Sequence, residues 1–484
     1  MAQSDGPTLA PTLAERIDNA VHPFSDAVSS IVFYSVDVFG VQLPLVVVWL
    51  IAAALILTLS LRFINITGFG HALALVSGRR THHLKGGDGE ISHFQALSSA
   101  LSGTVGLGNI ASVPVAIALG GPGAVFWMIL AGFFGMSSKF AECALAVKYR
   151  KVGPDGRTLG GPMFYIEDAF ARHGLKPLGK AAAVFFAVMA MGASISVFQV
   201  NQSYAQFSNV TGIVAPVTFG VIMSAGVAFV ILGGIKRIGS VSGILVPAMG
   251  VVYLAAALVI LALNIEHIPA AIGTIVSSAF GLDAAGGGLV GALINGIRRA
   301  TYSNEAGVGS SAIAHSAVKT SEPLTEGFVA SLEPFIDTVV VCTLTALVVI
   351  VTGAYEPFLF HADVRGIEIT SAAFASAFPW FPYILLVASM LFAFTTLVSW
   401  AFYGSQAAAY LFGANRRVDV IFKLTLCAML STGAAISLSS IIDFIDSMLF
   451  GMCIPNIIAL YILLPELKRD LATYNNKHRP NAAR

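Results

Sequence analysis

Long apolar runs are the main pattern along this chain, and polar residues gather in the segments between them. Each run is about 20 residues long, the length that a helix needs to cross the hydrocarbon core of a bilayer. The runs are continuous, whereas strands of a membrane β-barrel alternate over segments of about ten residues. The pattern predicts an all-α polytopic membrane protein with about eleven transmembrane helices. We expect these spans at residues 43–63, 93–119, 123–147, 180–207, 212–232, 241–263, 288–318, 328–352, 381–411, 420–438 and 441–464.

Basic residues in the connections indicate how the helices are oriented. Cytoplasmic loops of membrane proteins carry an excess of Lys and Arg, and here these residues gather in alternate connections, while the opposite side holds only Arg16 and Arg365. Eleven spans then place the N-terminus outside and the C-terminus in the cytoplasm, in the plasma membrane (the inner membrane of a bacterium). The basic connections on the cytoplasmic side lie at residues 62–85, 148–180, 236–237, 319, 416–423 and 468–484.

Composition agrees with a membrane protein. The chain is 56% hydrophobic and 11% charged, whereas roughly a quarter of the residues of a soluble protein are charged. A net charge of +1 gives no argument for nucleic acid as a partner. The four cysteines are scattered singly, so we interpret them as free thiols. The N-terminus lacks a basic region before its apolar run, which argues against a secretory signal.

The second span, 93–119, is interrupted at its centre. Gly103, Gly106, Gly108 and Asn109 lie where a continuous helix is expected, and Pro114 follows. Glycine costs a helix about 1 kcal/mol and proline about 3 kcal/mol relative to alanine. In lipid, a broken backbone persists only where protein covers it or where it lines a wet cavity. The pattern therefore predicts a binding site at this break.

The span 288–318 contains a second interruption, at residues 295–310. Arg298, Arg299 and Glu305 occur there together with two asparagines and three glycines. Such a segment cannot face lipid, because charged side chains within a membrane span face the bundle interior or a cavity. We expect it to be covered by other helices or to line a cavity.

The two interruptions occupy matching positions in two groups of spans if the first span is left out of the count. Ten spans remain, and each group of five opens with a broken helix, which is the pattern of an inverted repeat. The sequence therefore predicts a leucine-transporter-like five-plus-five arrangement with one extra N-terminal helix. The expected parts are an extracytoplasmic segment 1–42, an extra helix 43–66, a first repeat 93–265, a second repeat 288–465 and a cytoplasmic tail 466–484.

Broken helices also favour a particular ligand. Each break leaves unpaired amides at one half-helix and unpaired carbonyls at the other. The amide ends attract an anionic group and the carbonyl ends attract a cation. A zwitterionic amino acid together with a small hard cation suits this arrangement.

Strings around both breaks resemble those of the prokaryotic sodium:alanine/glycine symporters, a family of amino acid–cation symporters. They extend over most of the chain in order. The matching segments are 103–110 (GTVGLGNI), 120–128 (GGPGAVFWM), 135–150, 233–238 (GGIKRI), 303–315, 335–338 (FIDT), 392–400 and 454–456 (IPN). The resemblance implies Na⁺-coupled uptake of a small neutral amino acid, alanine or glycine, by alternating access.

The resemblance also implies roles for individual residues. Those expected to hold the amino acid are Thr104, Gly106, Asn109, Gln199, Ser303, Asn304 and Trp400. Those expected to coordinate Na⁺, through carbonyls in the first broken helix and hydroxyls in the eighth, are Ser102, Val105, Thr395 and Thr396. Na⁺ is the expected coupling ion, with no organic cofactor. The amino acid and membrane lipid are the expected partners, while the oligomeric state and the choice between Na⁺, H⁺ and Li⁺ stay open.

Several of these residues have a second, purely structural interpretation. The glycines of the first break could permit close helix packing. The two threonines could hydrogen-bond back to their own helix. Gln199 could make a cross-helix hydrogen bond, and Trp400 could be a core residue or an interfacial anchor.

The charged residues within spans also have structural interpretations. Lys139 and Glu142 are three positions apart and could pair on one helix face. Glu305 is expected to pair with Arg298 or Arg299 as a gate or a structural ion pair. His315 is expected to be a packed or capped residue.

Two rival functions are a channel and an intramembrane serine hydrolase. The hydrolase would use Ser310 or Ser311 with His315, but that spacing along one helix is too close for a persuasive nucleophile–base arrangement. The chain has no Walker A string, so ATP-driven transport is unsupported. We therefore expect a secondary transporter and not an enzyme.

Overall fold

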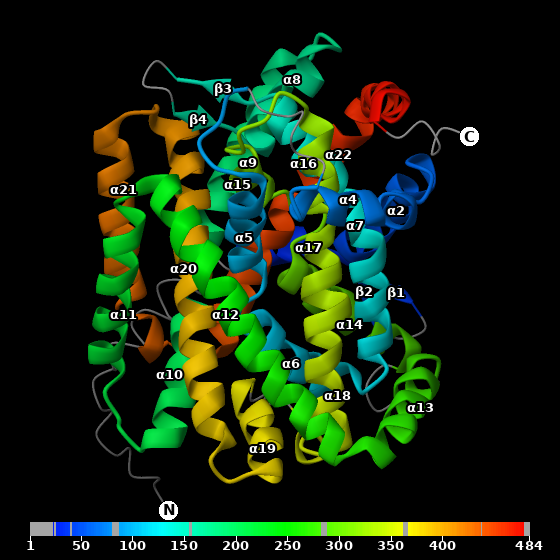
Figure 1. Cartoon of the computed structure of the whole chain (residues 1–484), viewed down its shortest axis with the longest axis vertical. Coiled ribbons are helices and arrows are strands. Elements are labelled where there is room, and N and C mark those ends of the chain that lie inside the picture. Colours follow the sequence, from blue (N-terminus) through cyan, green and yellow to red (C-terminus); the bar gives the residue numbers. More distant parts are fainter. Residues whose placement is uncertain are drawn as a thin grey trace, which may run out of the picture.

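Helices make up most of the structure, a computed structural model of the chain, and they lie side by side in a bundle (Figure 1). The structure describes residue 23 and residues 26–38, 41–79, 87–153, 157–281, 288–361, 366–436 and 438–478. Much of the expected segment 1–42 and the end of the expected tail 466–484 lie outside these residues.

The first half of the chain supplies two short antiparallel hairpins, with helices between them and after the second. Its strands and helices are β1 (Ser35–Val38), β2 (Val41–Pro44), α2 (Leu45–Ser60), α3 (Ile64–Thr67), α4 (Phe69–Val76), α5 (His93–Thr104), the π-helical turn η1 (Gly108–Ser112), α6 (Val113–Gly120), α7 (Ala124–Lys148), β3 (Lys151–Val152), β4 (Thr158–Leu159), α8 (Pro162–Ala171), α9 (Lys176–Ala193), α10 (Val197–Thr211), α11 (Pro216–Ile231), α12 (Gly234–Leu263), η2 (Ile265–His267) and α13 (Ile268–Ala279).

The second half consists of helices joined by turns and loops. Its elements are α14 (Gly288–Asn304), α15 (Ala312–His315), α16 (Pro323–Ala330), α17 (Leu332–Pro334), the π-helical segment η4 (Phe335–Cys342), α18 (Thr343–Val351), η5 (Glu356–Phe358), α19 (Ile367–Ala377), α20 (Phe381–Phe412), α21 (Arg416–Leu430), η6 (Gly433–Ala435) and α22 (Leu438–His478).

Each of the eleven predicted spans contains a helix. Among the described residues, seven helices are long and apolar enough to cross a membrane, or eight with the bent pair α5 and η1–α6. Helices α2, α11 and α14 are shorter, at 16, 16 and 17 residues. The mainly helical membrane fold is confirmed, whereas the count of eleven stays a prediction.

The first predicted break is present. Helix α5 begins with a capping box in which Ser92 and Gln95 satisfy each other's backbone amides, at 3.2 and 3.1 Å. It ends at Val105, whose extended backbone (φ −76°, ψ 90°) cannot continue a helix. The helix resumes at η1, and the two halves are bent by 42°.

The second predicted break is also present, and left-handed backbone maintains it. After α14, the residues Glu305, Gly307 and Gly309 have φ of 55°, 87° and 87°. Glycine adopts this region freely, but for glutamate it is unfavourable and persists only where the surroundings hold it. Asn456 of α22 donates to the Gly307 carbonyl at 2.9 Å, which helps to fix the loop.

The predicted connections gather at two opposite ends of the bundle. The hairpin β3–β4, helix α8 and the end of α22 lie at the top of Figure 1, while α13 and α19 lie at the bottom. The first group belongs to the basic connections and the second to the long outer connections 264–287 and 353–380. This separation agrees with the alternation expected from the sequence; which end faces the cytoplasm stays a prediction.

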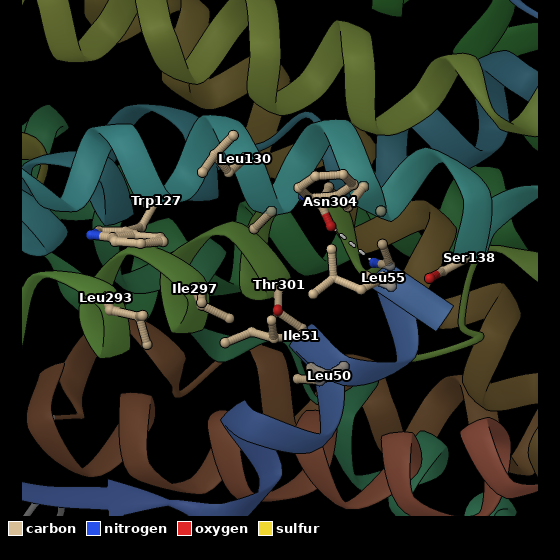
Figure 2. A pocket seen from close by; sticks show the side chains of 15 residues that line it. Leu50, Ile51, Leu55, Trp127, Leu130, Ser138, Leu293, Ile297, Thr301 and Asn304 are labelled. Carbon is tan, nitrogen blue, oxygen red and sulfur yellow. Dashed lines mark hydrogen bonds between the residues drawn. The ribbon is translucent and has the colours of Figure 1, made fainter. Parts of the chain in front are cut away.

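Helices α7 and α14 approach closely because Gly296 of α14 lies at their crossing. A Cβ on Gly296 would lie 2.3 Å from the Ala124 carbonyl oxygen and 2.9 Å from the Trp127 Cβ. Small residues at such crossings let backbones approach within a membrane. Beside this crossing, α2, α7 and α14 line an apolar cavity of about 160 Å³ (Figure 2).

We predict that Gly296→Ala destabilises the fold by about 1–3 kcal/mol, the usual effect of overpacking. The midpoint of thermal unfolding in detergent measures it. Gly250→Ala is the matched control, because a Cβ at Gly250 in α12 meets no atom within 4 Å. Equal midpoints for the two variants would contradict the close crossing.

Candidate functional site

The break in the first interrupted helix is held by two polar side chains. The Gly106 amide donates to Asn109 Oδ1 at 2.8 Å, and the Leu107 amide donates to Gln199 Oε1 of α10 at 3.1 Å. Asn109 is fully buried and Gln199 is 4% exposed. The backbone amides of the break therefore donate to side-chain oxygens. The cross-helix hydrogen bond that Gln199 makes is with the break itself.

A buried carboxylate joins the two breaks. Asp337 in η4 accepts from Asn109 Nδ2 at 2.7 Å and from the Ser303 hydroxyl at 2.8 Å, and Thr338 donates to it at 2.7 Å. It is 0% exposed. A Cβ on Gly108 would lie 3.5 Å from the Ser303 Cα, so the two broken segments are in direct van der Waals contact.

Asn304 faces a different direction from Ser303. Its amide donates to Thr338 Oγ1 at 2.9 Å, and its oxygen accepts from the Ala306 amide at 2.9 Å. Figure 2 shows it among the side chains that line the apolar cavity between α2, α7 and α14. The structure thus brings Ser303 to the first break and places Asn304 on the side of α14 next to α7.

A cluster of serines lies one turn before the first break. The Ser102 hydroxyl bonds to Ser242 of α12 at 3.2 Å and to Ser399 of α20. Ser399 also donates to the Ser99 carbonyl at 2.8 Å. Thr104 bonds back to the Ala100 carbonyl of its own helix at 3.3 Å. The hydroxyls therefore tie α5 to the two helices α12 and α20.

The hydroxyls of the two threonines of α20, Thr395 and Thr396, differ in their hydrogen bonding. Thr395 Oγ1 bonds back to the carbonyls of Leu391 and Phe392, at 3.0 and 3.2 Å, which is the structural interpretation of this residue. Thr396 Oγ1 is buried and has no hydrogen-bond partner among the residues that the structure describes. It lies 2.4 Å from where a Gly106 Cβ would be. Since oxygen is the ligand type that hard cations prefer, this unpaired hydroxyl beside Gly106 fits a cation ligand.

Trp400 is buried on the same helix, at 5% exposure. Its ring packs against Tyr403, with centroids 5.3 Å apart. The Tyr403 hydroxyl lies 2.8 Å from where a Gly103 Cβ would be. Trp400 therefore reaches the first broken helix through Tyr403, in agreement with a core position.

The structure corrects the expected ion pairs. Lys139 pairs with Glu333 at 3.3 Å and donates to Ser311, while Glu142 accepts from Asn456 at 2.8 Å. The expected Lys139–Glu142 pair is therefore replaced by a longer-range one. The reason is that α17 brings Glu333 to Lys139 and α22 brings Asn456 to Glu142.

The expected pairing of Glu305 with Arg298 or Arg299 is wrong. Both arginines pair with Asp446 of α22, and Arg298 does so at 2.9 Å. The left-handed turn at Glu305 directs its carboxylate inward instead, where it accepts from the Ser310 hydroxyl.

The residues of the rival hydrolase are not assembled as a catalytic group. In the part of the chain that the structure describes, Ser310 donates to Glu305 and Ser311 accepts from Lys139. Both ring nitrogens of His315 contact glutamates. Neither serine hydroxyl is therefore hydrogen-bonded to the imidazole ring that would act as its base.

Comparison with protein families matches residues 26–484 to the description "Sodium:alanine symporter family". The chain belongs to this family. It is 40% identical to the Sodium/alanine symporter AgcS of Methanococcus maripaludis, over 89% of this chain and 94% of that protein. It is 35% identical to the Sodium/proton-dependent alanine carrier protein of Bacillus sp. strain PS3, over 72% of this chain and 79% of that protein.

Among solved structures, the chain is similar to MhsT in complex with L-phenylalanine. The TM-score is 0.55 at 15% identity, covering 79% of this chain and 98% of that one. This similarity shows the fold alone, which is that of the leucine-transporter-like proteins. As a member of the sodium:alanine symporter family, the chain is an integral membrane transporter and not an enzyme.

Sequence reasoning missed Asp337 as a site residue. The residue stood within a recognised string but received no role. The available signal was an acidic residue at the start of an apolar run, because an ionisable group inside a span is a functional candidate by default. Its contacts with Asn109 and Ser303 depend on tertiary packing, which spacing along the chain does not reveal.

We predict that Gly106→Ala lowers the rate of substrate transport about tenfold or more, because the new methyl group must displace the Thr396 hydroxyl from the break. Gly108→Ala is the matched control, since its Cβ would meet Ser303 only at ordinary contact distance. Uptake into proteoliposomes measures both. Equal losses would contradict the assigned contact.

Proposed function

We propose that the chain couples the uptake of a small neutral amino acid, alanine or glycine, to the entry of Na⁺ by alternating access. The observation that carries this proposal is the meeting of two broken helices at one buried carboxylate, Asp337. A transporter of this kind needs a site at mid-membrane that other parts of the bundle can expose to either side in turn. The names of the relatives AgcS and the Bacillus carrier support sodium and alanine as its cargo.

The proposed amino acid site lies between the two breaks. The amides of Gly106 and Leu107 now donate to side chains, so a substrate carboxylate would replace the oxygens of Asn109 and Gln199 as their partner. The Asp337 carboxylate would offset the positive charge of the substrate ammonium group or of Na⁺. Thr104 and Ser303 would border this space. Asn304 and Trp400 would support it from positions behind the residues that line it.

The proposed Na⁺ position lies between α5 and α20. The ligands would be the carbonyls of Ser102 and Val105 and the hydroxyl of Thr396, because oxygen ligands suit a hard cation. The Thr396 hydroxyl is the strongest member of this set, since it is buried and unpaired among the described residues. Thr395 would join only by giving up its bonds to its own helix.

The architecture proposed for this function is the five-plus-five repeat. The first repeat would be residues 93–265 and the second 288–465, with 43–66 as the extra helix. Each repeat opens with a broken helix, α5–α6 and α14–α15, which supports the proposal. The N-terminus would lie outside and the C-terminus in the cytoplasm.

We predict Na⁺-driven accumulation of radiolabelled alanine in proteoliposomes. An inward Na⁺ gradient should concentrate alanine above equilibrium, while equal Na⁺ on both sides should only equilibrate it. Replacing Na⁺ by K⁺ with an inward proton gradient distinguishes Na⁺ from H⁺ coupling. Alanine flux that does not depend on any ion gradient would contradict symport and favour a channel.

We predict that Thr396→Ala raises the Na⁺ concentration for half-maximal uptake about tenfold, the effect of about 1.4 kcal/mol. The removed hydroxyl is the proposed ligand, so alanine affinity at saturating Na⁺ should change little. Thr395→Ala is the matched control, because that hydroxyl is bonded to its own helix. Unchanged Na⁺ activation in Thr396→Ala would remove this residue from the cation site.

A further inference from the structure

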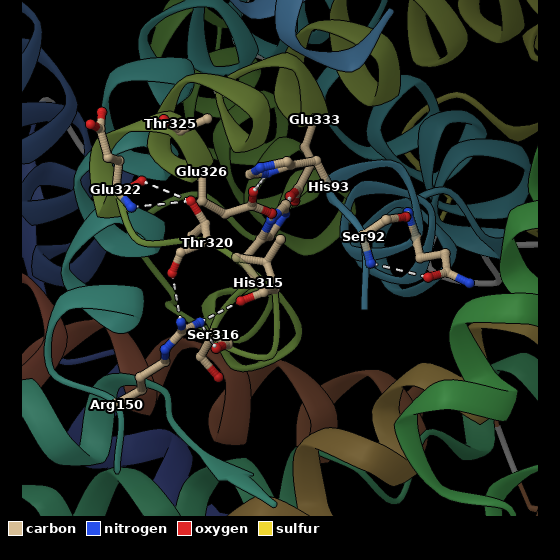
Figure 3. Close-up of polar contacts among 12 residues, drawn as sticks. Ser92, His93, Arg150, His315, Ser316, Thr320, Glu322, Thr325, Glu326 and Glu333 are labelled. Atoms are coloured by element: carbon tan, nitrogen blue, oxygen red, sulfur yellow. Dashed lines mark hydrogen bonds and ion pairs between the residues drawn. The ribbon is translucent and has the colours of Figure 1, made fainter. Parts of the chain in front are cut away.

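A second buried polar cluster lies away from the proposed substrate site. It joins the start of α5, in the first broken helix, to the end of α15, in the second. We define the histidine clasp as His93, Lys139, His315, Glu326 and Glu333 (Figure 3 shows four of them). His93 opens α5, His315 ends α15, and the two glutamates lie on α16 and α17. Except for His93, whose side chain is 12% exposed, these side chains are completely buried. The clasp therefore ties the first broken helix to the second within the buried interior.

His315 contacts a carboxylate through each ring nitrogen. Its Nδ1 lies 2.5 Å from Glu326 Oε1, and its Nε2 contacts Glu333 Oε1. A neutral imidazole has only one N–H and carries a lone pair on the other nitrogen. One of the two contacts would then bring a lone pair against an ionised oxygen. Both contacts are hydrogen bonds if the ring carries a second proton.

The second oxygen of each carboxylate already has another partner. Glu326 Oε2 contacts His93 Nδ1, and Glu333 Oε2 pairs with Lys139 at 3.3 Å. Imidazole is a stronger base than a carboxylate, so the extra proton belongs on the ring. A positive His315 also lowers the cost of burying two carboxylates, which is high when either lacks a partner.

Other titratable groups interact electrostatically with Lys139, Glu326 or Glu333 of the clasp. The groups beyond the clasp itself are Glu142 and Cys143 of α7, Glu305 of the second break, Arg150 after α7, and Tyr403 of α20.

Contacts to the backbone hold the segment before α5 against the segment after α15, beside the clasp. Arg150 donates to the carbonyls of Ser316 and Thr320, both at 2.9 Å, and also to those of Asp88 and Val318. Ile91 forms a β-bridge with Val318, just before α5 begins. Helix α5 cannot move away from α15 without breaking these contacts and the clasp together.

We propose that the histidine clasp is a proton-binding site that holds the cytoplasmic end of the bundle closed. The proton resides on the His315 ring while the clasp is intact. When the clasp opens, water reaches the glutamates, the ring returns to its ordinary basicity and the proton passes to cytoplasmic water. The closing and opening rest on the proposed function, whereas the bound proton does not.

Solid-state NMR of ¹⁵N-histidine-labelled protein in lipid bilayers at pH 7.5 tests the proton directly. Exposed histidines are mostly neutral at this pH. We expect one imidazolium, with both nitrogens protonated, that disappears in His315→Gln and persists in His173→Gln, whose ring is exposed after α8. A neutral His315 ring would overturn the proposal. The result stands apart from transport, so failure of the uptake test would not affect it.

Alkylation of Cys143 tests the closure. This thiol is completely buried and lies within 4.8 Å of ligand atoms of His315 and Glu333. At pH 7.5 we expect N-ethylmaleimide to modify it about tenfold faster in His315→Gln than in wild type or His173→Gln, read by peptide mass spectrometry. Equal rates would overturn the closing role.

His93→Gln keeps the proposal testable if His315→Gln does not fold. This change leaves His315 between both carboxylates. The imidazolium signal of His315 must then persist at pH 7.5. Its loss would show that the two carboxylates do not hold the proton, and would overturn the proposal.

Discussion

The Asp337 carboxylate is the point on which the centre of the bundle depends. It is buried within a membrane protein, where an ionised group is retained only with donors or an opposite charge beside it. Its donors come from both interrupted helices, Asn109 from the first and Ser303 from the second. The same contacts therefore satisfy the carboxylate and hold two broken backbones against each other. Changes in one break can therefore reach the other through this group as well as through the direct contact of Gly108 with Ser303.

Polar and charged contacts along the second broken helix form three layers. Arg298 and Arg299 pair with Asp446 of α22 at one level, and Ser303 meets Asp337 at the next. His315 lies between Glu326 and Glu333 at the far end. Each layer joins this helix to a different partner element. Such layers suit a transporter, because the contacts on either side of a central site can be made and broken in turn.

Much of this arrangement could be predicted from the sequence, because interruptions within apolar runs are local signals. The glycines at 106 and 108 and the polar string after residue 295 marked both breaks, and the structure has them there. The partners of the charged residues could not be predicted. Lys139 was expected to pair three positions away on its own helix, but the partner that reaches it is Glu333, brought by the packing of α17 on α7. Glu305 likewise turned away from the arginines because its backbone is left-handed.

The most direct test of the central claim is a cryo-electron microscopy map of the protein in bilayer discs with alanine and Na⁺. The account predicts density for the amino acid between residues 105–109 and Ser303, beside Asp337, with a separate peak near the Thr396 hydroxyl. Continuous helices through both breaks, or alanine bound elsewhere in the bundle, would contradict it.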